Sequence, residues 1–325
     1  MGVTPAAMSS GIDSASAAAE PAPLAATPPT KVTNFNHADP AAIQHNGVIY
    51  SYATDGTTGG RKIPTITATS PLGPYTQVGK TLNAIPWADG GPVMGPHVVH
   101  KGGSRFHMYF TTGQATHPDK CIGVAVSLDG PLGPFVPRDN PLACDNDHNG
   151  AIAPSFFNDP RTGRNYLLYK TNGPNAIRRV WLQGLGPDGL AKDGSGRTLL
   201  GERDFNYENP QIIFSAGKYF LFMSRDGYET ADYKTTVNWS SNVDGPYPAD
   251  RAHAIMTREN THVAGPGSAE LLKLDTGEWM AFFHGWIQDG AGCDPPRFLY
   301  VATIAWGPAN DNPHLAAPRN LGAGC

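Results

Sequence analysis

Gly217-Lys218-Tyr219-Phe220 is one of five copies of a segment in which a glycine precedes alternating aromatic or aliphatic residues. The other copies are Gly47-Val48-Ile49-Tyr50, Gly103-Ser104-Arg105-Phe106, Gly163-Arg164-Asn165-Tyr166 and Gly277-Glu278-Trp279-Met280. Successive copies begin 56, 60, 54 and 60 residues apart. Because such alternation after a turn residue is typical of a half-buried β-strand, the chain is predicted to repeat one β-rich unit five times.

Two further elements recur with the same period. A proline lies ahead of each glycine, and the five are Pro40, Pro96, Pro154, Pro210 and Pro266. Three repeats also contain a Gly-Pro-aromatic turn, namely Gly73-Pro74-Tyr75, Gly133-Pro134-Phe135 and Gly245-Pro246-Tyr247. One repeat therefore reads as four antiparallel strands joined by tight turns.

Five four-stranded sheets can bury both faces when they are arranged radially, which predicts an all-β fold, a five-bladed β-propeller. A linear β-solenoid is the alternative, but its coils are shorter than this repeat. We assign residues 31–325 to the propeller, with the five prolines at equivalent positions near one mouth of its channel. Residues 1–30 are rich in Ala, Pro and Ser, so they are predicted to form a disordered leader.

Composition restricts the partners. The chain has 28 acidic and 24 basic residues, a net charge of −4, and no long run of one sign. This argues against binding to nucleic acid or to an anionic membrane surface. No stretch approaches the roughly 20 apolar residues of a membrane span. The expected partner is a neutral molecule, and the chain is expected to be a monomer.

The cysteines predict the compartment. The four are Cys121, Cys144, Cys293 and Cys325, and their spacing fits neither zinc sites nor redox motifs. Among the three possible pairings we favour Cys121 with Cys144 and Cys293 with Cys325. Disulfides indicate a secreted protein, whereas four buried free thiols in a cytosolic protein are the alternative. Asn238-Trp239-Ser240 is a glycosylation sequon.

Two acidic residues are candidates for chemistry. In a propeller the innermost strand of each blade lines the channel, so residues just before it gather at one mouth. The residues before the five prolines are Asp39, Gly95, Ala153, Asn209 and Gly265. Glu208 lies one position further back in the fourth repeat. A structural repeat has no reason to carry an acid in only two of five copies. The structural alternative is that Asp39 caps a turn and Glu208 is a solvated charge.

Several motifs resemble glycoside hydrolase family 43 in their order and spacing. They are Asn36-His37-Ala38-Asp39-Pro40, Tyr50-Ser51-Tyr52-Ala53-Thr54, Cys121-Ile122-Gly123, Pro141-Leu142-Ala143-Cys144, Gly150-Ala151-Ile152-Ala153-Pro154, Gly265-Pro266-Gly267 and Phe283-His284-Gly285-Trp286. The resemblance covers residues 36 to about 306. The Cys-Ile-Gly and Leu-x-Cys motifs are similar to those of a branch that contains exo-acting α-L-arabinofuranosidases.

The resemblance implies an inverting glycosidase with Asp39 as general base and Glu208 as general acid, and no cofactor. It implies release of α-L-arabinofuranosyl residues from an arabinose-containing polysaccharide or oligosaccharide of plant type or of cell walls. Endo-arabinanase and β-xylosidase activities are alternatives on the same fold. The side chains expected to bind sugar are His37, Trp87, His97, Phe156 and Trp286. For Trp87, Phe156 and Trp286 the alternative is a place in the blade core, and for Phe156 that alternative is at least as strong.

Two positions depart from the family pattern. Ala153 stands where the family has an aspartate that orients the acid and favours its protonated form, and Gly95-Pro96-His97 replaces Ala-Pro-Asp. Without that charge Glu208 is expected to be ionised near neutral pH and to be a poor acid, unless Asp145 or Asp147 substitutes. A catalytically inactive carbohydrate-binding propeller is therefore the alternative function.

The channel is expected to hold no essential metal. Ser268 stands where family members often carry a histidine that helps to hold an ion or water. His97 and His284 are the other candidates for channel ligands, but they lack a recognisable ligand spacing.

Overall fold

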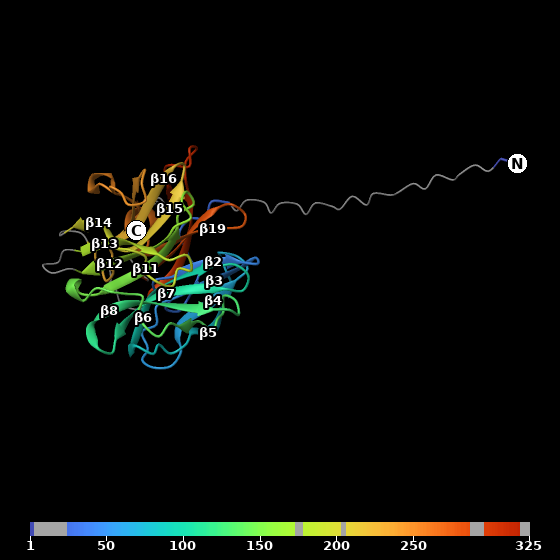
Figure 1. Cartoon of the computed structure of the whole chain (residues 1–325). Coiled ribbons are helices and arrows are strands. Elements are labelled where there is room, and N and C mark those ends of the chain that lie inside the picture. Colours follow the sequence, from blue (N-terminus) through green and yellow to red (C-terminus); the bar gives the residue numbers. More distant parts are fainter. Residues whose placement is uncertain (3–24, 173–177, 203–205, 287–295, 319–325) are drawn as a thin grey trace.

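The computed structural model describes residues 1–2, 25–172, 178–202, 206–286 and 296–318, and these form five antiparallel sheets (Figure 1). The sheets are the blades of a β-propeller, which confirms the predicted fold class. In every blade three consecutive strands of the chain are hydrogen-bonded neighbours. The first of the three borders the central channel. The N-terminal strand β1 joins the last blade beside β21.

The blades follow one another along the chain. The first contains β2 (Ala41–His45), β3 (Val48–Tyr52), β4 (Lys62–Ala68) and β5 (Thr76–Leu82). The second contains β6 (Ala88–His100), β7 (Phe106–Gln114), β8 (His117–Ser127), β9 (Val136–Pro137) and β10 (Ala143–Cys144). The third contains β11 (Ala151–Asn158), β12 (Asn165–Asn172), β13 (Arg178–Leu185) and β14 (Arg197–Glu202).

The last two blades complete the ring. The fourth contains β15 (Glu208–Ser215), β16 (Lys218–Arg225), β17 (Lys234–Ser240) and β18 (His253–Met256). The fifth contains β19 (Ala264–Lys273), β20 (Trp279–Trp286), β21 (Phe298–Ala305), β22 (His314–Leu315) and β1 (Thr30–Lys31). The short helical segments of the described part of the chain lie between strands, and they are η1 (Asn146–His148), η3 (Ala249–Arg251) and α1 (Arg258–Thr261).

The repeated glycines occupy the turn between the first and second strands of each blade. Their φ angles lie between 57° and 96°, and they are Gly47, Gly103, Gly163, Gly217 and Gly277. Side chains with a Cβ atom are disfavoured in this left-handed region. The backbone of the turn is therefore the physical reason for the sequence period.

The first strand of every blade also bends at a left-handed residue. Strand pairing places five residues in equivalent positions, with φ between 50° and 55°: Asp39, Gly95, Ala153, Asn209 and Ser268. Asp39 and Glu208 therefore occupy neighbouring positions of the repeat. Four of the predicted prolines follow this bend and line the channel: Pro40, Pro96, Pro154 and Pro210.

The fifth blade departs from the predicted proline pattern, because Pro266 is not equivalent to the other four prolines. Ala269 takes the place that the other blades give to proline, and it lines the channel. Pro266 lies three residues earlier. A register shift between Ala264 and Gly267 accommodates the additional residues in β19. The proline spacing gave no sign of this insertion, because Pro266 follows Pro210 at the usual interval although it is not the structurally equivalent residue.

The N-terminal segment closes the ring. The pair β1–β21 joins Thr30 to Val301, and the backbone of Thr27 exchanges hydrogen bonds of 2.9 Å with Thr303, one to its hydroxyl and one from its N–H. Residues 25–30, predicted as part of the leader, therefore belong to the fifth blade. Residues 3–24 lie outside the described residues.

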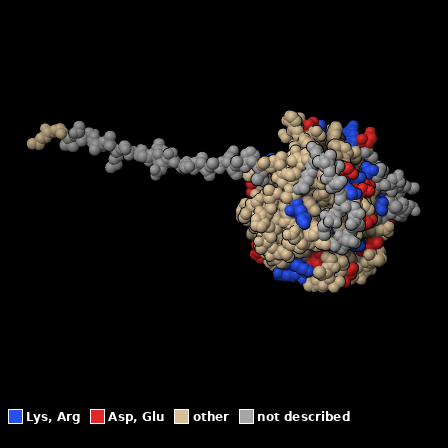
Figure 2. Space-filling view, turned by 180° about the vertical axis from the view of Figure 1, so that it is seen from behind, with Lys and Arg blue, Asp and Glu red and all other residues tan. Residues whose placement is uncertain are grey.

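Buried apolar side chains fill the spaces between neighbouring blades. One cluster joins Ile43 and Tyr52 of the first blade to Met108 and Phe110 of the second. The sheets therefore need their neighbours to bury both faces, as the radial arrangement predicts. On the face shown in Figure 2, acidic and basic side chains are interspersed. No helix among the described residues is long and apolar enough to cross a membrane.

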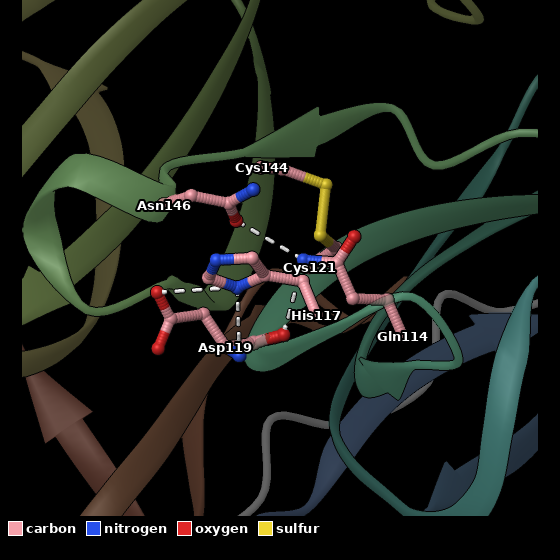
Figure 3. The surroundings of a disulfide bond; sticks show 6 residues. All are labelled: Gln114, His117, Asp119, Cys121, Cys144 and Asn146. Carbon is pink, nitrogen blue, oxygen red and sulfur yellow. Dashed lines mark hydrogen bonds and ion pairs between the residues drawn. A yellow bond between two sulfur atoms is a disulfide. The ribbon is translucent and has the colours of Figure 1, made fainter.

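Two of the four cysteines form a disulfide. Cys121 and Cys144 face each other across the β8–β10 pair with a Cα–Cα distance of 4.5 Å, which confirms the predicted bond (Figure 3). The predicted partners Cys293 and Cys325 lie outside the described residues. Asn238 of the sequon is fully buried and donates to the Pro248 carbonyl at 2.7 Å, so the folded chain offers no room for a glycan there.

Candidate active site

A cavity of about 360 Å³ opens where the channel meets the surface, and all five blades contribute to its lining. Asp39 and Glu208 both lie in this lining, together with Ala153 of the third blade and Arg297 of the fifth. The adjoining channel is narrow, with a void of about 30 Å³. The structure therefore brings the two predicted catalytic carboxylates to one cavity.

Asp39 is held as a carboxylate. Its Oδ1 accepts a hydrogen bond from Arg297 Nη1 at 3.1 Å, and its Oδ2 accepts one from the Thr54 hydroxyl at 2.6 Å. Burial raises the pKa of Asp39, but the charge of Arg297 and the hydrogen bonding outweigh it, so the pKa lies well below its ordinary value. Asp39 is therefore ionised at neutral pH, as a general base must be.

His284 positions the backbone of this residue. Its Nδ1 accepts a hydrogen bond from the Asp39 N–H at 3.1 Å, and the side chain is fully buried. Burial and the nearby charge of Arg297 lower the pKa of His284, although the Asp39 carboxylate opposes this. The ring is therefore neutral near pH 7, which leaves Nδ1 free to accept.

Glu208 has a different environment. Its Oε2 lies 3.1 Å from Lys170 Nζ, which also donates to Asn206 Oδ1 at 2.8 Å. Burial lowers the pKa of Lys170, and the Glu208 carboxylate opposes that shift. Glu208 Oε1 is buried and has no hydrogen-bond partner among the described residues. One oxygen of Glu208 is thus engaged in an ion pair, and the other makes no hydrogen bond within the described protein.

Ala153 lines the same cavity as Asp39 and Glu208. Its φ is 55°, and its N–H donates to the Thr111 hydroxyl at 3.0 Å. The predicted substitutes for the missing carboxylate, Asp145 and Asp147, lie outside the cavity lining, and Asp145 instead bonds to His148 at 2.6 Å. Asp119, which sequence reasoning did not single out, does line the cavity.

Three of the five predicted sugar-binding residues, one of them buried and two half-buried, lie outside the cavity lining. His37 is buried and hydrogen-bonds Ser51 at 2.9 Å, and burial lowers the pKa of His37 to about 3. Trp87 is half-buried and stacks on Phe110, against the apolar cluster between the first and second blades. Phe156 packs with the third-blade core, as its structural alternative predicts.

The other two lie close to the site. His97 lines the narrow channel, where its Nδ1 is 3.2 Å from Glu270 Oε2. Trp286 is buried, and its ring centroid lies 5.8 Å from the guanidinium of Arg297. Trp286 therefore supports a residue that touches Asp39. Among the described residues, no group of three or more His, Cys, Asp and Glu side chains is arranged to hold a metal.

Sequence reasoning missed a polar position that repeats in every blade. It lies opposite the residue that precedes the left-handed bend, in or just after the second strand, and is occupied by Thr54, Thr111, Lys170, Ser224 and His284. Three of these hydroxyls accept the N–H of the bend in the next blade, at 2.7 to 3.1 Å. The same period that revealed the glycines would have found Thr54 and Lys170. Arg297 carries no such signal, because it precedes a strand and belongs to no repeat.

A propeller with two carboxylates in one cavity has the design of a glycosidase, because such enzymes place a pair of Asp or Glu residues on either side of the scissile bond. Comparison with known proteins makes the family explicit. Residues 83–310 match glycosyl hydrolases family 43. The chain is 34% identical over 312 residues to the probable arabinan endo-1,5-alpha-L-arabinosidase B of Aspergillus fumigatus, covering 81% of this chain and 82% of the fungal protein. The chain belongs to glycoside hydrolase family 43 and is a glycosidase.

Solved structures share the fold. A thermostable family-43 glycoside hydrolase superimposes with a TM-score of 0.76 at 20% identity, covering 90% of this chain and 97% of that one. An exo-1,5-alpha-L-arabinanase from a bovine ruminal metagenomic library has a TM-score of 0.68 at 20% identity, with coverages of 87% and 98%.

Proposed function

We propose that this glycosidase hydrolyses α-L-arabinofuranosidic bonds in arabinan and arabino-oligosaccharides, with inversion at the anomeric carbon. The observation that carries the proposal is the shared cavity in which Asp39 is held ionised while one oxygen of Glu208 is left unpaired among the described residues. The fungal relative named as an arabinan-degrading enzyme supports the choice of sugar.

The two carboxyl groups take complementary roles. Asp39 removes a proton from a water molecule as that water attacks the anomeric carbon, and Glu208 donates a proton to the glycosidic oxygen as the carbon–oxygen bond breaks. Inversion requires a separation of about 6.5–9.5 Å between the carboxyl groups, which leaves room for the water. Lys170 then stabilises the Glu208 carboxylate that remains, and exchange with solvent restores both protonation states.

A second candidate function rests on one specific observation. Lys170 pairs with Glu208 at 3.1 Å, and an ion pair requires the carboxylate form, whereas a general acid must carry a proton. Position 153 supplies no negative charge to oppose this pairing. A propeller that binds arabinose-containing chains without cleaving them is therefore the alternative.

The mode of cleavage belongs to the proposal. The sequence motifs predict exo action, which releases single arabinose units, whereas the fungal relative is named as an endo enzyme. β-Xylosidase activity is the third possibility on this fold. We also propose that the protein is secreted, because the disulfide between Cys121 and Cys144 suits an oxidising compartment.

One assay separates these functions. The purified chain is incubated with linear arabinan, arabino-oligosaccharides, and aryl α-L-arabinofuranoside and β-D-xyloside, and the products are separated by chromatography. Single arabinose units indicate exo action and short oligomers indicate endo action. Asp39→Asn and Glu208→Gln serve as matched, nearly isosteric controls. Hydrolysis that survives both substitutions would refute the assigned roles, and binding without hydrolysis would favour the non-catalytic alternative.

A further inference from the structure

Tyr228 is an exposed aromatic residue in the cavity that holds Asp39 and Glu208. It lines the cavity, yet 49% of its surface remains exposed. Leaving an aromatic ring in water forgoes the free energy that its burial would provide. Its position at the edge of a binding cavity indicates a surface that a ligand covers.

The turn that carries Tyr228 is held in place. It joins β16 to β17, and at its base Asp226 pairs with Lys234 at 2.9 Å. The Tyr228 carbonyl accepts a hydrogen bond from the Trp286 indole N–H at 3.2 Å. The ring is thus positioned before a ligand arrives, so binding need not order this segment.

One contact links Tyr228 to the proposed base. The Arg297 guanidinium lies 5.3 Å from the centroid of the Tyr228 ring and donates to Asp39 at 3.1 Å. Tyr228 is therefore separated from Asp39 by a single side chain. A sugar ring on Tyr228 would lie beside the sugar attacked at Asp39, rather than at a distant surface site.

We infer that Tyr228 forms a stacking platform for a second furanose ring of the same chain, next to the ring at which hydrolysis takes place. The C–H face of a furanose packs on an aromatic ring through apolar burial and dispersion. The inference rests on the proposed function, because it takes arabino-oligosaccharides as the ligand. It makes Tyr228 a residue that selects oligosaccharides over single arabinosides.

Binding without turnover tests the platform. In a Glu208→Gln background, calorimetry compares arabinotetraose with methyl α-L-arabinofuranoside for Tyr228, Tyr228→Phe and Tyr228→Ala. Tyr228→Ala is expected to weaken tetraose binding about tenfold, the effect of losing roughly 60 Å² of apolar contact. Methyl arabinoside binding should stay within about twofold, and Tyr228→Phe, which keeps the ring, should behave as the parent.

The remaining outcomes overturn the inference in distinguishable ways. Equal tetraose affinity in the three proteins would show that Tyr228 makes no sugar contact. Equal losses for both sugars would show that Tyr228 acts only by supporting Arg297. A parent that binds neither sugar would remove the platform together with the proposed substrate. A Tyr228-dependent preference for tetraose in a chain that hydrolyses nothing supports the platform and refutes the hydrolytic function alone.

Discussion

Ala153 is unfavourable both for the backbone conformation at its position and for the proposed chemistry. Its φ of 55° belongs to the left-handed region, where equivalent positions carry Asp39, Gly95, Asn209 and Ser268. An alanine there costs about 1–2 kcal/mol, whereas Gly, Asn and Asp are tolerated better. Ala153 thus gains no conformational benefit and supplies no charge, which makes it the informative position for substitution.

Ala153→Asp should increase hydrolysis. A carboxylate at 153 would face the cavity that contains Glu208 and favour the protonated form of the acid. General acid catalysis is typically worth 10²–10⁴-fold, so we expect a gain of about 10- to 1,000-fold on a substrate with a poor leaving group. An activated aryl arabinofuranoside should gain less, because its leaving group needs little protonation. Steady-state kinetics on both substrates measure the difference.

Ala153→Asn is the matched control for that substitution. Asparagine has the shape of aspartate and tolerates the same φ, but it carries no charge. Equal activity of the two variants would assign the gain to backbone relief rather than to electrostatics. If Ala153→Asp improves hydrolysis of no arabinofuranoside while sugar binding persists, the chain is a binding propeller.

Arg297→Gln should move the acid limb of the pH–rate profile. Burial alone raises the pKa of Asp39, and Arg297 is the leading opposing influence. Removing its charge should therefore raise the pKa of Asp39, so kcat/KM falls off at a higher pH than in the unaltered enzyme. Arg297→Lys, which retains a positive charge, should shift the limb less. An unchanged limb in Arg297→Gln would show that another group titrates there.

The same pKa sets a stability dependence. The pKa of Asp39 is lower in the folded chain than in the unfolded chain, where it is near 3.8. Ionised Asp39 therefore stabilises the fold at pH values above about 3.8. This stabilisation is lost as the pH falls towards the depressed pKa. The difference in free energy of unfolding between the unaltered chain and Asp39→Asn should therefore narrow on acidification below about pH 4.

At the scale of elements, the disulfide ties together two parts of the cavity wall. Pro118, Asp119 and Lys120 precede Cys121, and Asn149 follows Cys144 by five residues; all four wall residues line the cavity. The Gln114 amide connects the same segments, donating to the Asp119 carbonyl at 3.2 Å and to Asn146 Oδ1 at 3.0 Å (Figure 3). β10 is only two residues long, so the covalent link is a main restraint on this wall.

Replacing Cys121 and Cys144 by serine should weaken both fold and binding. Closing a loop of this length contributes about 3 kcal/mol in the chain-entropy description. We expect the free energy of unfolding to fall by about that amount and KM to rise more than kcat falls, because the wall loosens while Asp39 and Glu208 stay in place. Unfolding curves and kinetics measure both effects. Alkylation of both Cys121 and Cys144 in the denatured, unreduced parent would contradict the premise.

Gly123→Ala should destabilise the second blade. A Cβ atom at 123 would lie 2.4 Å from the ring of Phe110 and 2.8 Å from that of Trp87. Phe110 is fully buried and cannot move aside. Overpacking of this kind costs about 1–3 kcal/mol, measured as a shift in denaturant midpoint. Gly130→Ala in the same blade is a poor control because its φ is 96°, whereas Gly56→Ala meets open space and should change little.

The sequence predicted features that depend on neighbouring residues and missed contacts between residues far apart in the chain. Local backbone requirements recur in the sequence, so Gly217 and its counterparts predicted the five blades. The place of Asp39 and Glu208 in the same repeat made them the candidates for catalysis. Arg297 reaches Asp39 across 258 residues of chain and fits no period, so only the fold reveals the contact. For Trp87 the sequence could not separate a place against the blade core from a sugar platform, and the structure packs the half-buried ring against the core.

For the whole molecule, closure of the ring depends on its N-terminal segment. β1 forms the fourth strand of the main path through the fifth sheet, beside β21. The chain thus joins residues near 30 to residues near 300, so the ends of the described propeller hold each other. Without β1, part of the β21 edge would expose unpaired backbone groups, which invites association with other chains.

Deleting residues 1–31 should therefore destabilise the propeller as a unit. The deletion removes the β1–β21 ladder and both hydrogen bonds between Thr27 and Thr303, at about 1 kcal/mol each net, so we expect a loss of about 2–4 kcal/mol. Deleting only residues 1–24 is the matched control and should leave the free energy of unfolding unchanged, because β1 and Thr27 remain. Denaturant unfolding compares the three proteins, and size-exclusion chromatography shows whether the longer deletion associates through its exposed edge. If both deletions unfold at the parent midpoint, the N-terminal strand does not close the ring, and the contacts within β19, β20 and β21 suffice to hold the fifth blade.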